Sequence, residues 1–168
     1  MTKCPAFLNA PTDNLLKPGV LLSEFMRLSV NGHFGQLDKA GKPYILHCLR
    51  VMGGVDSDDE ELQCIAVAHD VVEDGKVTYQ DLIDAGATKR VLKGIWGMTR
   101  IPGETEDEYR ARICENLDCI KCKLSDLKDN GDITRLKGVT EKDFARMKKY
   151  HESYLLFKRK LKEWMTNS

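Results

Sequence analysis

The amino-acid sequence predicts an all-helical protein, and three features of the chain carry this prediction. Apolar residues recur at spacings of three and four, as in Leu21, Leu22, Phe25, Met26 and Leu28, which places them on one face of a helix. No segment alternates apolar and polar residues over four or more positions, as a half-buried strand would. Proline, glycine and N-cap residues separate the apolar segments at intervals typical of helices.

The length and composition fit one domain. The chain has 168 residues, of which 42% are hydrophobic, so it can bury a core without disulfides. No repeat, low-complexity tract or linker divides it. We therefore expect a single domain over residues 1–168, with its core at about 18–164.

Turn-forming residues delimit three helices in the first half of the chain. Proline suits the first turn of a helix, and glycine suits the residue after the last turn. Pro18-Gly19 opens the first long helix and Asn31-Gly32 closes it, whereas Pro43 begins the second and Gly53-Gly54 ends it. The third helix is predicted from about Ser57 to Val72, with a stop at Gly75.

N-cap residues predict the helices of the second half. Thr78 caps a short helix that ends at Gly86, Thr88 caps one to about Met98, and Thr105 caps one through Tyr109 to Cys114. A helix that carries Cys119 to Asn130 follows Asn116, and a T-x-x-D capping box of Thr140 and Asp143 starts a final helix to about Trp164. The loop from Arg100 to Asp107 is either a lid over a site or an ordinary connector.

Charge and cysteine content restrict the function classes. Lys and Arg together balance Asp and Glu at 26 each, so we expect neither nucleic acid nor a membrane as a partner. No signal sequence or apolar stretch of about 18 residues is present, and we expect a cytoplasmic protein. Of the six cysteines, Cys48, Cys64 and Cys114 lie in apolar helical patterns, as reduced core cysteines do, and Cys119-x-x-Cys122 lacks the second ligand pair of a zinc site.

Four polar residues end the otherwise apolar third helix: His69, Asp70, Glu73 and Asp74. They cap or pair locally, or they bind a ligand, since burying them without partners is costly. His47 and Asp126 lie in other apolar helical segments. Two imidazoles and the carboxylates of Asp70 and Asp126 form a mixed nitrogen and oxygen set that suits Mn²⁺ or Fe²⁺ and can bind Zn²⁺.

Five blocks of sequence resemble the hydrolase domain of the RelA/SpoT group. They are His33-Phe-Gly-Gln36, Gly41-Lys-Pro-Tyr-Ile-Leu-His47, His69-Asp-Val-Val-Glu-Asp74, Gly94-Ile-Trp-Gly-Met-Thr-Arg100 and Lys123-Leu-Ser-Asp-Leu-Lys-Asp-Asn130, in family order within residues 20 to 150. The resemblance implies a helical bundle of the HD-domain type and a role in the stringent response. Such a protein is a metal-dependent phosphohydrolase that removes the 3′-pyrophosphate of guanosine 3′,5′-bis(diphosphate) (ppGpp), normally with Mn²⁺, and Fe²⁺, Zn²⁺ and Mg²⁺ are the alternative metals.

The resemblance also implies roles for individual residues. His47, His69, Asp70 and Asp126 would be the metal ligands, and Glu73 with Asp74 would act on the nucleophilic water. The sequence leaves open which of these two carboxylates is the base. The substrate contacts would be Tyr44, Asn130, Lys39 and Lys123.

The chain departs from the family pattern where the nucleotide should lie. Asp38 stands where the family has an arginine, Leu127 replaces a second arginine, and Cys48 replaces a proline. Fewer arginines mean less charge complementary to a polyanion. An alternative substrate is therefore a deoxynucleotide or a cyclic or adenine-based nucleotide, with Asp38 accepting a hydrogen bond from an exocyclic amine. A second alternative is a non-catalytic nucleotide- or partner-binding module, with the basic C-terminal helix as the docking element.

Overall fold

The computed structural model describes residues 5–6, 17, 19–73 and 76–167, and nearly all of its regular structure is helical. Within these residues, the only extended pairing is an isolated antiparallel bridge between Leu37 and Pro43. The helices are α1 (Val20–Gly32), α2 (Ile45–Gly54), α3 (Glu60–Val67), α4 (Tyr79–Asp84), α5 (Lys89–Met98), α6 (Glu106–Cys114), α7 (Leu117–Asn130), the 3₁₀ helix η2 (Ile133–Arg135) and α8 (Glu141–Asn167). The predicted all-helical class is confirmed.

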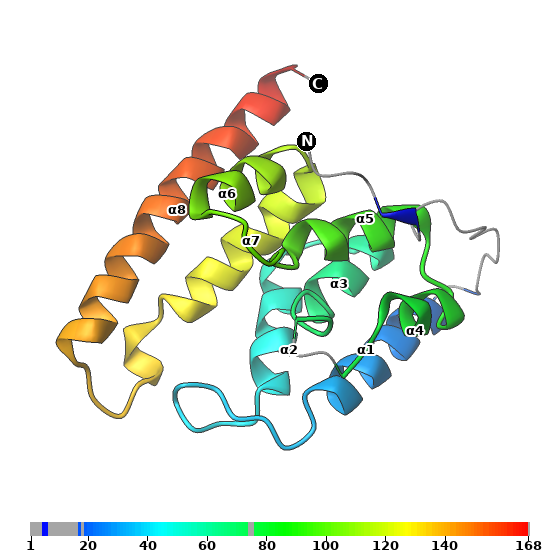
Figure 1. The fold of residues 1–168 in the computed structure, drawn as a ribbon, viewed down its shortest axis with the longest axis horizontal. Coiled ribbons are helices and arrows are strands. Elements are labelled where there is room, and N and C mark those ends of the chain that lie inside the picture. Colours follow the sequence, from blue (N-terminus) through cyan, green and yellow to red (C-terminus); the bar gives the residue numbers. More distant parts are fainter. Residues whose placement is uncertain (1–4, 7–16, 18, 74–75, 168) are drawn as a thin grey trace.

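Helix α3 forms the centre of the molecule, with α1, α2, α5 and α7 packed around it (Figure 1). It is short, and the consecutive residues Cys64, Ile65, Ala66 and Val67 are all fully buried. A helical turn that is apolar on every side, as these four residues are, belongs in a core. The chain segment that follows α3 is therefore placed in the interior, where α2 and α7 also pass.

Helix α8 lies along the outside of the bundle against α7 (Figure 1). Phe157 anchors it in the core, and Arg110 Nη2 on α6 donates a hydrogen bond of 2.8 Å to Ser153 Oγ on α8. Most of the other side chains on α8 face the solvent or are half-buried. The aromatic residue at this position is thus part of the core rather than of a docking surface.

Side-chain caps fix the helix starts that the sequence predicts. Thr78 with Asp81, and Thr105 with Glu108, form complete capping boxes at the starts of α4 and α6. Thr140 exchanges the same two hydrogen bonds with Asp143 at the start of α8. These bonds satisfy backbone N–H groups that have no partner within the helix, and the observed starts agree closely with the predictions.

The predicted third helix, from about Ser57 to Val72, is wrong at both ends. Helix α3 begins at Glu60 because the side chain of Asp59 caps the N–H groups of Glu61 and Leu62. It ends at Val67, and residues 68–73 form turns. His69 and Asp70 therefore project from a turn and not from a helix.

Side chains compete for the carbonyl groups at the C-terminal end of α3. Ser29 Oγ donates to the carbonyl of Val67, and His69 Nδ1 lies 2.8 Å from the carbonyl of Ala66. With these carbonyls bonded to side chains, the chain can leave the helix without burying unpaired acceptors. The expected stop at Gly75 lies outside the described residues.

The described cysteines are free thiols, and Cys48, Cys64, Cys119 and Cys122 are buried. Burial raises the pKa of Cys48 to about 11 and that of Cys119 to about 12, which makes these thiols unreactive. The expectation of reduced core cysteines is confirmed for Cys48 and Cys64, whereas Cys114 is only half-buried. Among the described residues, no helix combines the length and apolar character that a membrane crossing requires.

Candidate metal centre and adjoining pockets

Three separate parts of the fold bring four candidate ligands together. His47 comes from α2, His69 and Asp70 come from the turn after α3, and Asp126 comes from α7. His47 Nε2 lies 3.3 Å from Asp126 Oδ1, and His69 Nε2 lies 2.9 Å from Asp70 Oδ2. One ligand atom each from His47, His69 and Asp126 falls within 4.8 Å of the others. The structure thus gathers the predicted set at one point.

Both imidazole rings are oriented by a partner on Nδ1. His47 Nδ1 lies 2.7 Å from Asp129 Oδ2, and His69 Nδ1 lies 2.8 Å from the carbonyl of Ala66. An acceptor on Nδ1 fixes the proton there and leaves the Nε2 lone pair free for a cation. Both Nε2 atoms are buried, and neither makes a well-formed hydrogen bond with any described residue.

Electrostatics also fit a cation at this point. Burial disfavours a charged carboxylate, yet Lys123 and the imidazoles hold the pKa of Asp126 well below its ordinary value. Burial likewise disfavours an imidazolium, but the carboxylates of Asp70 and Asp126 raise the pKa of His69. The site therefore attracts a positive charge between its carboxylates. Two nitrogens and two carboxylates are a donor set for a divalent transition metal.

Neighbouring side chains hold the two carboxylate ligands in place. Tyr44 donates its hydroxyl proton to Asp70 Oδ2 at 2.6 Å. Lys123 Nζ donates to Asp126 Oδ2 at 2.7 Å, and the side-chain amide of Asn130 donates to Asp126 Oδ1. Three of the residues predicted to contact substrate thus touch the ligands themselves.

Glu73 lies at the exposed end of the turn that carries His69 and Asp70. Its Oε1 accepts a hydrogen bond of 2.8 Å from the backbone N–H of Arg100. Desolvation of the carboxylate and the nearby charge of Asp70 raise its pKa, although the bond from Arg100 opposes this. A carboxylate with a raised pKa suits proton transfer near neutral pH. Asp74, the other predicted base, lies outside the described residues.

A pocket of about 200 Å³ opens beside His47. Its lining includes four of the predicted substrate residues, namely Asp38, Lys39, Tyr44 and Asn130. Arg135, Arg146 and Tyr150 also line it, and none of these was predicted from the sequence. Arg146 and Tyr150 lie on α8. The sequence alone indicates a solvated helix face for this basic stretch, but α8 packs against α7.

Asp38 is occupied by protein partners. Its Oδ1 accepts hydrogen bonds of 2.9 Å from the N–H groups of Ala40 and Lys42, and its Oδ2 pairs with Arg135. Burial favours the neutral acid, but these partners hold the pKa of Asp38 below its ordinary value. The arrangement argues against Asp38 as the acceptor for an exocyclic amine. It also places the Arg135 guanidinium at the pocket that lacks an arginine at position 38.

A second pocket, of about 430 Å³, lies between α6, α7 and α8. Five cations line it together with three carboxylates, of which Glu106 and Asp107 pair with the arginines of the same wall; the cations are Arg100, Arg110, Lys123, Arg146 and Lys149. It shares Arg146 and Tyr150 with the first pocket, and Lys123 connects it to the metal ligand Asp126. A cluster of cations beside a metal centre is suited to phosphate groups.

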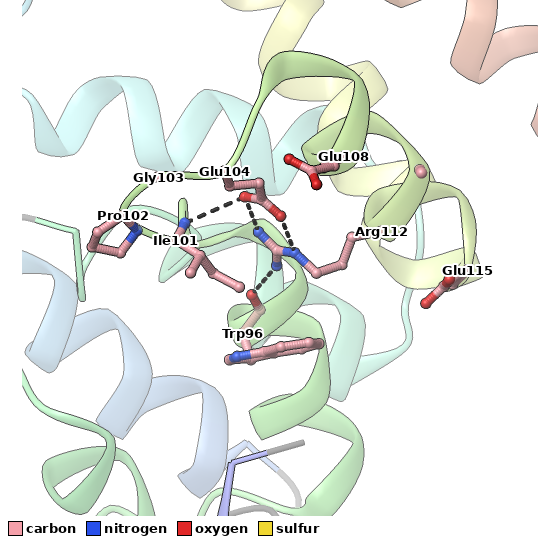
Figure 2. Close-up of a pocket in the computed structure, with 9 residues that line it drawn as sticks. Trp96, Ile101, Pro102, Gly103, Glu104, Glu108, Arg112 and Glu115 are labelled. Carbon is pink, nitrogen blue, oxygen red and sulfur yellow. Dashed lines mark hydrogen bonds and ion pairs between the residues drawn. The ribbon is translucent and has the colours of Figure 1, made fainter. Parts of the chain in front are cut away.

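A third pocket, of about 610 Å³, lies at the loop that was a candidate lid (Figure 2). Arg112 on α6 pairs with Glu104 in this loop at 2.8 Å, and the two side chains are only 7% and 8% exposed. Arg112 also donates to the carbonyls of Trp96, Gly97 and Thr99 at the end of α5. These bonds fasten the base of the loop, which favours a connector over a lid.

Comparisons with known proteins agree with this geometry. No protein-family model matches the chain. Over 109 residues, which make up 58% of this chain, the sequence is 34% identical to the guanosine-3′,5′-bis(diphosphate) 3′-pyrophosphohydrolase of Aquifex aeolicus (strain VF5). The match spans only 15% of that protein's length.

A solved structure described as a metazoan ortholog of SpoT that hydrolyzes ppGpp is also similar. It matches with a TM-score of 0.69 over 89% of this chain and 96% of its own, at 19% sequence identity. At this identity the likeness establishes the fold. The predicted HD-type helical bundle and the predicted resemblance to SpoT-like proteins are both confirmed.

Proposed function

We propose that this protein is a metal-dependent phosphohydrolase that removes the 3′-pyrophosphate from guanosine 3′,5′-bis(diphosphate). The observation that carries the proposal is the convergence of two buried, oriented imidazole Nε2 atoms with the carboxylates of Asp70 and Asp126. The similarity to a 3′-pyrophosphohydrolase of Aquifex aeolicus supports the choice of substrate. A cytoplasmic location and the absence of nucleic-acid and membrane partners stay predictions.

The metal would be held by His47, His69, Asp70 and Asp126, a mixed nitrogen and oxygen donor set that suits Mn²⁺. Fe²⁺, Zn²⁺ and Mg²⁺ are the alternatives. When bound, the cation lowers the pKa of a water molecule and neutralises charge on a phosphoryl oxygen. Tyr44, Lys123 and Asn130 keep the carboxylate ligands in place through the hydrogen bonds described above.

Glu73 would accept the proton of the attacking water. Glu73 lies at the end of the turn that carries His69 and Asp70. The backbone N–H of Arg100, in the loop after α5, donates a hydrogen bond to the carboxylate of Glu73. The raised pKa makes it a stronger base than an ordinary glutamate. Water attacks phosphorus, the bond to the ribose 3′-oxygen breaks, and the products are GDP and pyrophosphate. Asp74 is the alternative base.

The two pockets beside the centre would hold the rest of the nucleotide. The smaller pocket offers Lys39, Tyr44 and Arg135, and the basic pocket offers Lys123 with four further cations. These side chains supply the positive charge that Asp38 and Leu127 do not. The cations of the two pockets therefore weaken the chemical objection to a substrate with two diphosphate groups, although Arg135 and Arg146 are also paired with aspartates of the protein.

The direct test is product analysis with purified protein and Mn²⁺. Guanosine bis(diphosphate) and a panel of ordinary deoxy-, cyclic and adenine nucleotides are incubated beside the Asp70→Ala variant. Pyrophosphate and GDP from the bis(diphosphate), absent with the variant, are the expected result. Turnover of another nucleotide alone would keep the metal chemistry and replace the substrate, and no turnover of any compound would favour a binding module.

A further inference from the structure

Asp129 is a nearly buried carboxylate that belongs to none of the predicted ligand or substrate sets. It lies on α7, three residues after Asp126, and its side chain is 9% exposed. Its Oδ2 is 2.7 Å from His47 Nδ1. Asp129 therefore contacts a metal ligand on the side of the ring that faces away from the metal.

Two arginines from different elements clamp Asp129. Arg50 on α2 donates from Nε to Oδ1 at 2.5 Å and from Nη2 to Oδ2 at 3.2 Å. Arg135 on η2 donates from Nη1 to Oδ2 at 2.5 Å and to the backbone carbonyl of Asp129 at 2.8 Å. The other Nη of Arg135 pairs with Asp38. The carboxylate is thus fixed from both sides, and it cannot rotate away from His47 without breaking these bonds.

The Asp129 carboxylate determines the tautomer of the His47 ring. An ionised carboxylate accepts hydrogen bonds only, so the proton of a neutral His47 must lie on Nδ1. The lone pair then lies on Nε2, which faces Asp126 Oδ1 at 3.3 Å and Asp70 Oδ2 at 3.8 Å. Without Asp129, the ring could carry its proton on Nε2 and turn that N–H toward the carboxylates instead.

We infer that Asp129 is a positioning residue that holds His47 in its metal-binding tautomer, and that Arg50, Arg135 and Asp38 hold Asp129. The same chain of ion pairs places Arg135 at the wall of the small pocket. One network thus links the metal ligand to the loop around Asp38. The inference rests on the proposed function for its metal centre, but it does not depend on which nucleotide is the substrate.

The test variant is Asp129→Asn. An asparagine has one acceptor oxygen, for which both arginines compete, and its NH₂ group then faces His47 Nδ1. A donor at this position favours the Nε2–H tautomer, which cannot bind a metal. We expect the dissociation constant for Mn²⁺, measured by calorimetry on metal-free protein, to rise by about ten- to a hundredfold.

A matched control is Asp132→Asn, which makes the same change three residues away at the same pocket. Asp132 bonds to Thr134 and contacts no ligand, so its Mn²⁺ affinity should equal that of the wild type. Nitrogen-15 NMR of histidine-labelled, metal-free protein reports the tautomer directly. His47 should change from Nδ1–H to Nε2–H in Asp129→Asn alone, a shift that a merely structural role would not produce.

Arg50→Met guards against a variant that fails to fold. Arg50 is 40% exposed, and its loss leaves Arg135 bonded to Oδ2 of Asp129, so we expect a smaller loss of Mn²⁺ affinity in a folded protein. Equal Mn²⁺ affinity and an unchanged tautomer in Asp129→Asn, or unchanged affinity in Arg50→Met where Asp129→Asn does not fold, would overturn the inference. Wild-type protein that binds Mn²⁺ but releases no pyrophosphate would contradict the proposed substrate alone.

Discussion

Among the acidic side chains of the candidate centre, Glu73 has a distinct electrostatic state. The pKa values of Asp70 and Asp126 are held below the ordinary value by cationic partners in spite of burial, whereas desolvation and the charge of Asp70 raise the pKa of Glu73. Two of these groups are therefore suited to bind a cation, and the third is suited to exchange a proton. A division of this kind between neighbouring carboxylates is typical of catalytic sites.

Replacing Glu73 by glutamine should lower kcat by about 10²- to 10⁴-fold, because the amide cannot accept the proton. The Mn²⁺ affinity should not change, since Glu73 is not a ligand. In the wild type only the ionised base is active, so kcat should fall as the pH drops through the raised pKa of Glu73. The pH–rate profile of the variant should lack this acid limb, and a variant with wild-type kcat would move the base to Asp74.

At single positions, sequence reasoning identified groups whose chemistry is rare in a core. The segment that begins with His69 and Asp70 was singled out because polar groups that end an apolar helix require partners, and the resemblance to the RelA/SpoT group implied the full ligand set of His47, His69, Asp70 and Asp126. Asp129 and Arg135 were missed because a charged residue near a helix end is usually exposed to solvent, and nothing in the sequence marks these two as different. Only the fold shows that both point inward, toward His47 and Asp38.

At the scale of elements, the loop between α5 and α6 is fastened by one buried ion pair, Arg112 with Glu104. The hydrogen bonds from Arg112 lower the pKa of Glu104 despite burial. The same loop presents the N–H of Arg100 to Glu73. The ion pair of Arg112 with Glu104, drawn in Figure 2, therefore helps to position Glu73 by holding the loop that bonds to it.

The variant Glu104→Gln should lower the free energy of unfolding by about 3 kcal/mol at pH 7, because it leaves the charge of Arg112 buried and unpaired. The folded-state pKa of Glu104 lies below its unfolded value, so the pair stabilises the protein above pH 4.5 and loses this effect as the pH falls further. The variant should lack this part of the acid dependence. Urea unfolding over a pH series measures both effects.

The control is Glu115→Gln, a carboxylate at the same pocket. As a substitution away from the ion pair, it should change the unfolding free energy by no more than about 0.5 kcal/mol. Equal stability of both variants would show that the ion pair does not hold the loop.

Close helix packing around α3 depends on glycines in the neighbouring helices. A Cβ added at Gly94 on α5 would lie 2.4 Å from Ile65 Cδ1 and within 3.0 Å of two further atoms of that side chain. A Cβ added at Gly53 on α2 would meet nothing within 4 Å. The two glycines differ in their surroundings, although both lie in helices.

Gly94→Ala should destabilise the fold by about 1–3 kcal/mol through overpacking, even though alanine favours helix. The matched change Gly53→Ala should be neutral or stabilise by up to about 1 kcal/mol. Thermal unfolding of both variants measures the difference. Similar melting temperatures would contradict the close contact of α5 with α3.

Most helices could be predicted from the sequence because their limits are set locally, by N-caps such as Thr78, Thr105 and Thr140. The third helix could not, because its end depends on Ser29, which is 38 residues away from Val67 in the chain. The pockets beside the candidate metal centre could not be predicted from the sequence either, because they form only where α8 packs against α7. Local signals thus predict most helices, whereas the orientation of the site residues depends on long-range contacts that the sequence does not show.

Across the whole molecule, the candidate ligands join α2, the turn after α3 and α7. An unfolded chain does not hold these groups together, so a cation should bind the folded state preferentially. At a free Mn²⁺ concentration of a hundred times the dissociation constant, the free energy of unfolding should rise by about 2.7 kcal/mol. Denaturant unfolding with Mn²⁺ or EDTA measures this, and Asp70→Ala should show much less stabilisation.

The most direct test of the central claim is a titration of metal-free protein with Mn²⁺ while pyrophosphate release from guanosine bis(diphosphate) is followed. A single centre built from His47, His69, Asp70 and Asp126 predicts a rate that rises in proportion to added metal and levels off at one ion per chain. Full activity in EDTA, or a rate that does not depend on Mn²⁺, would contradict the account.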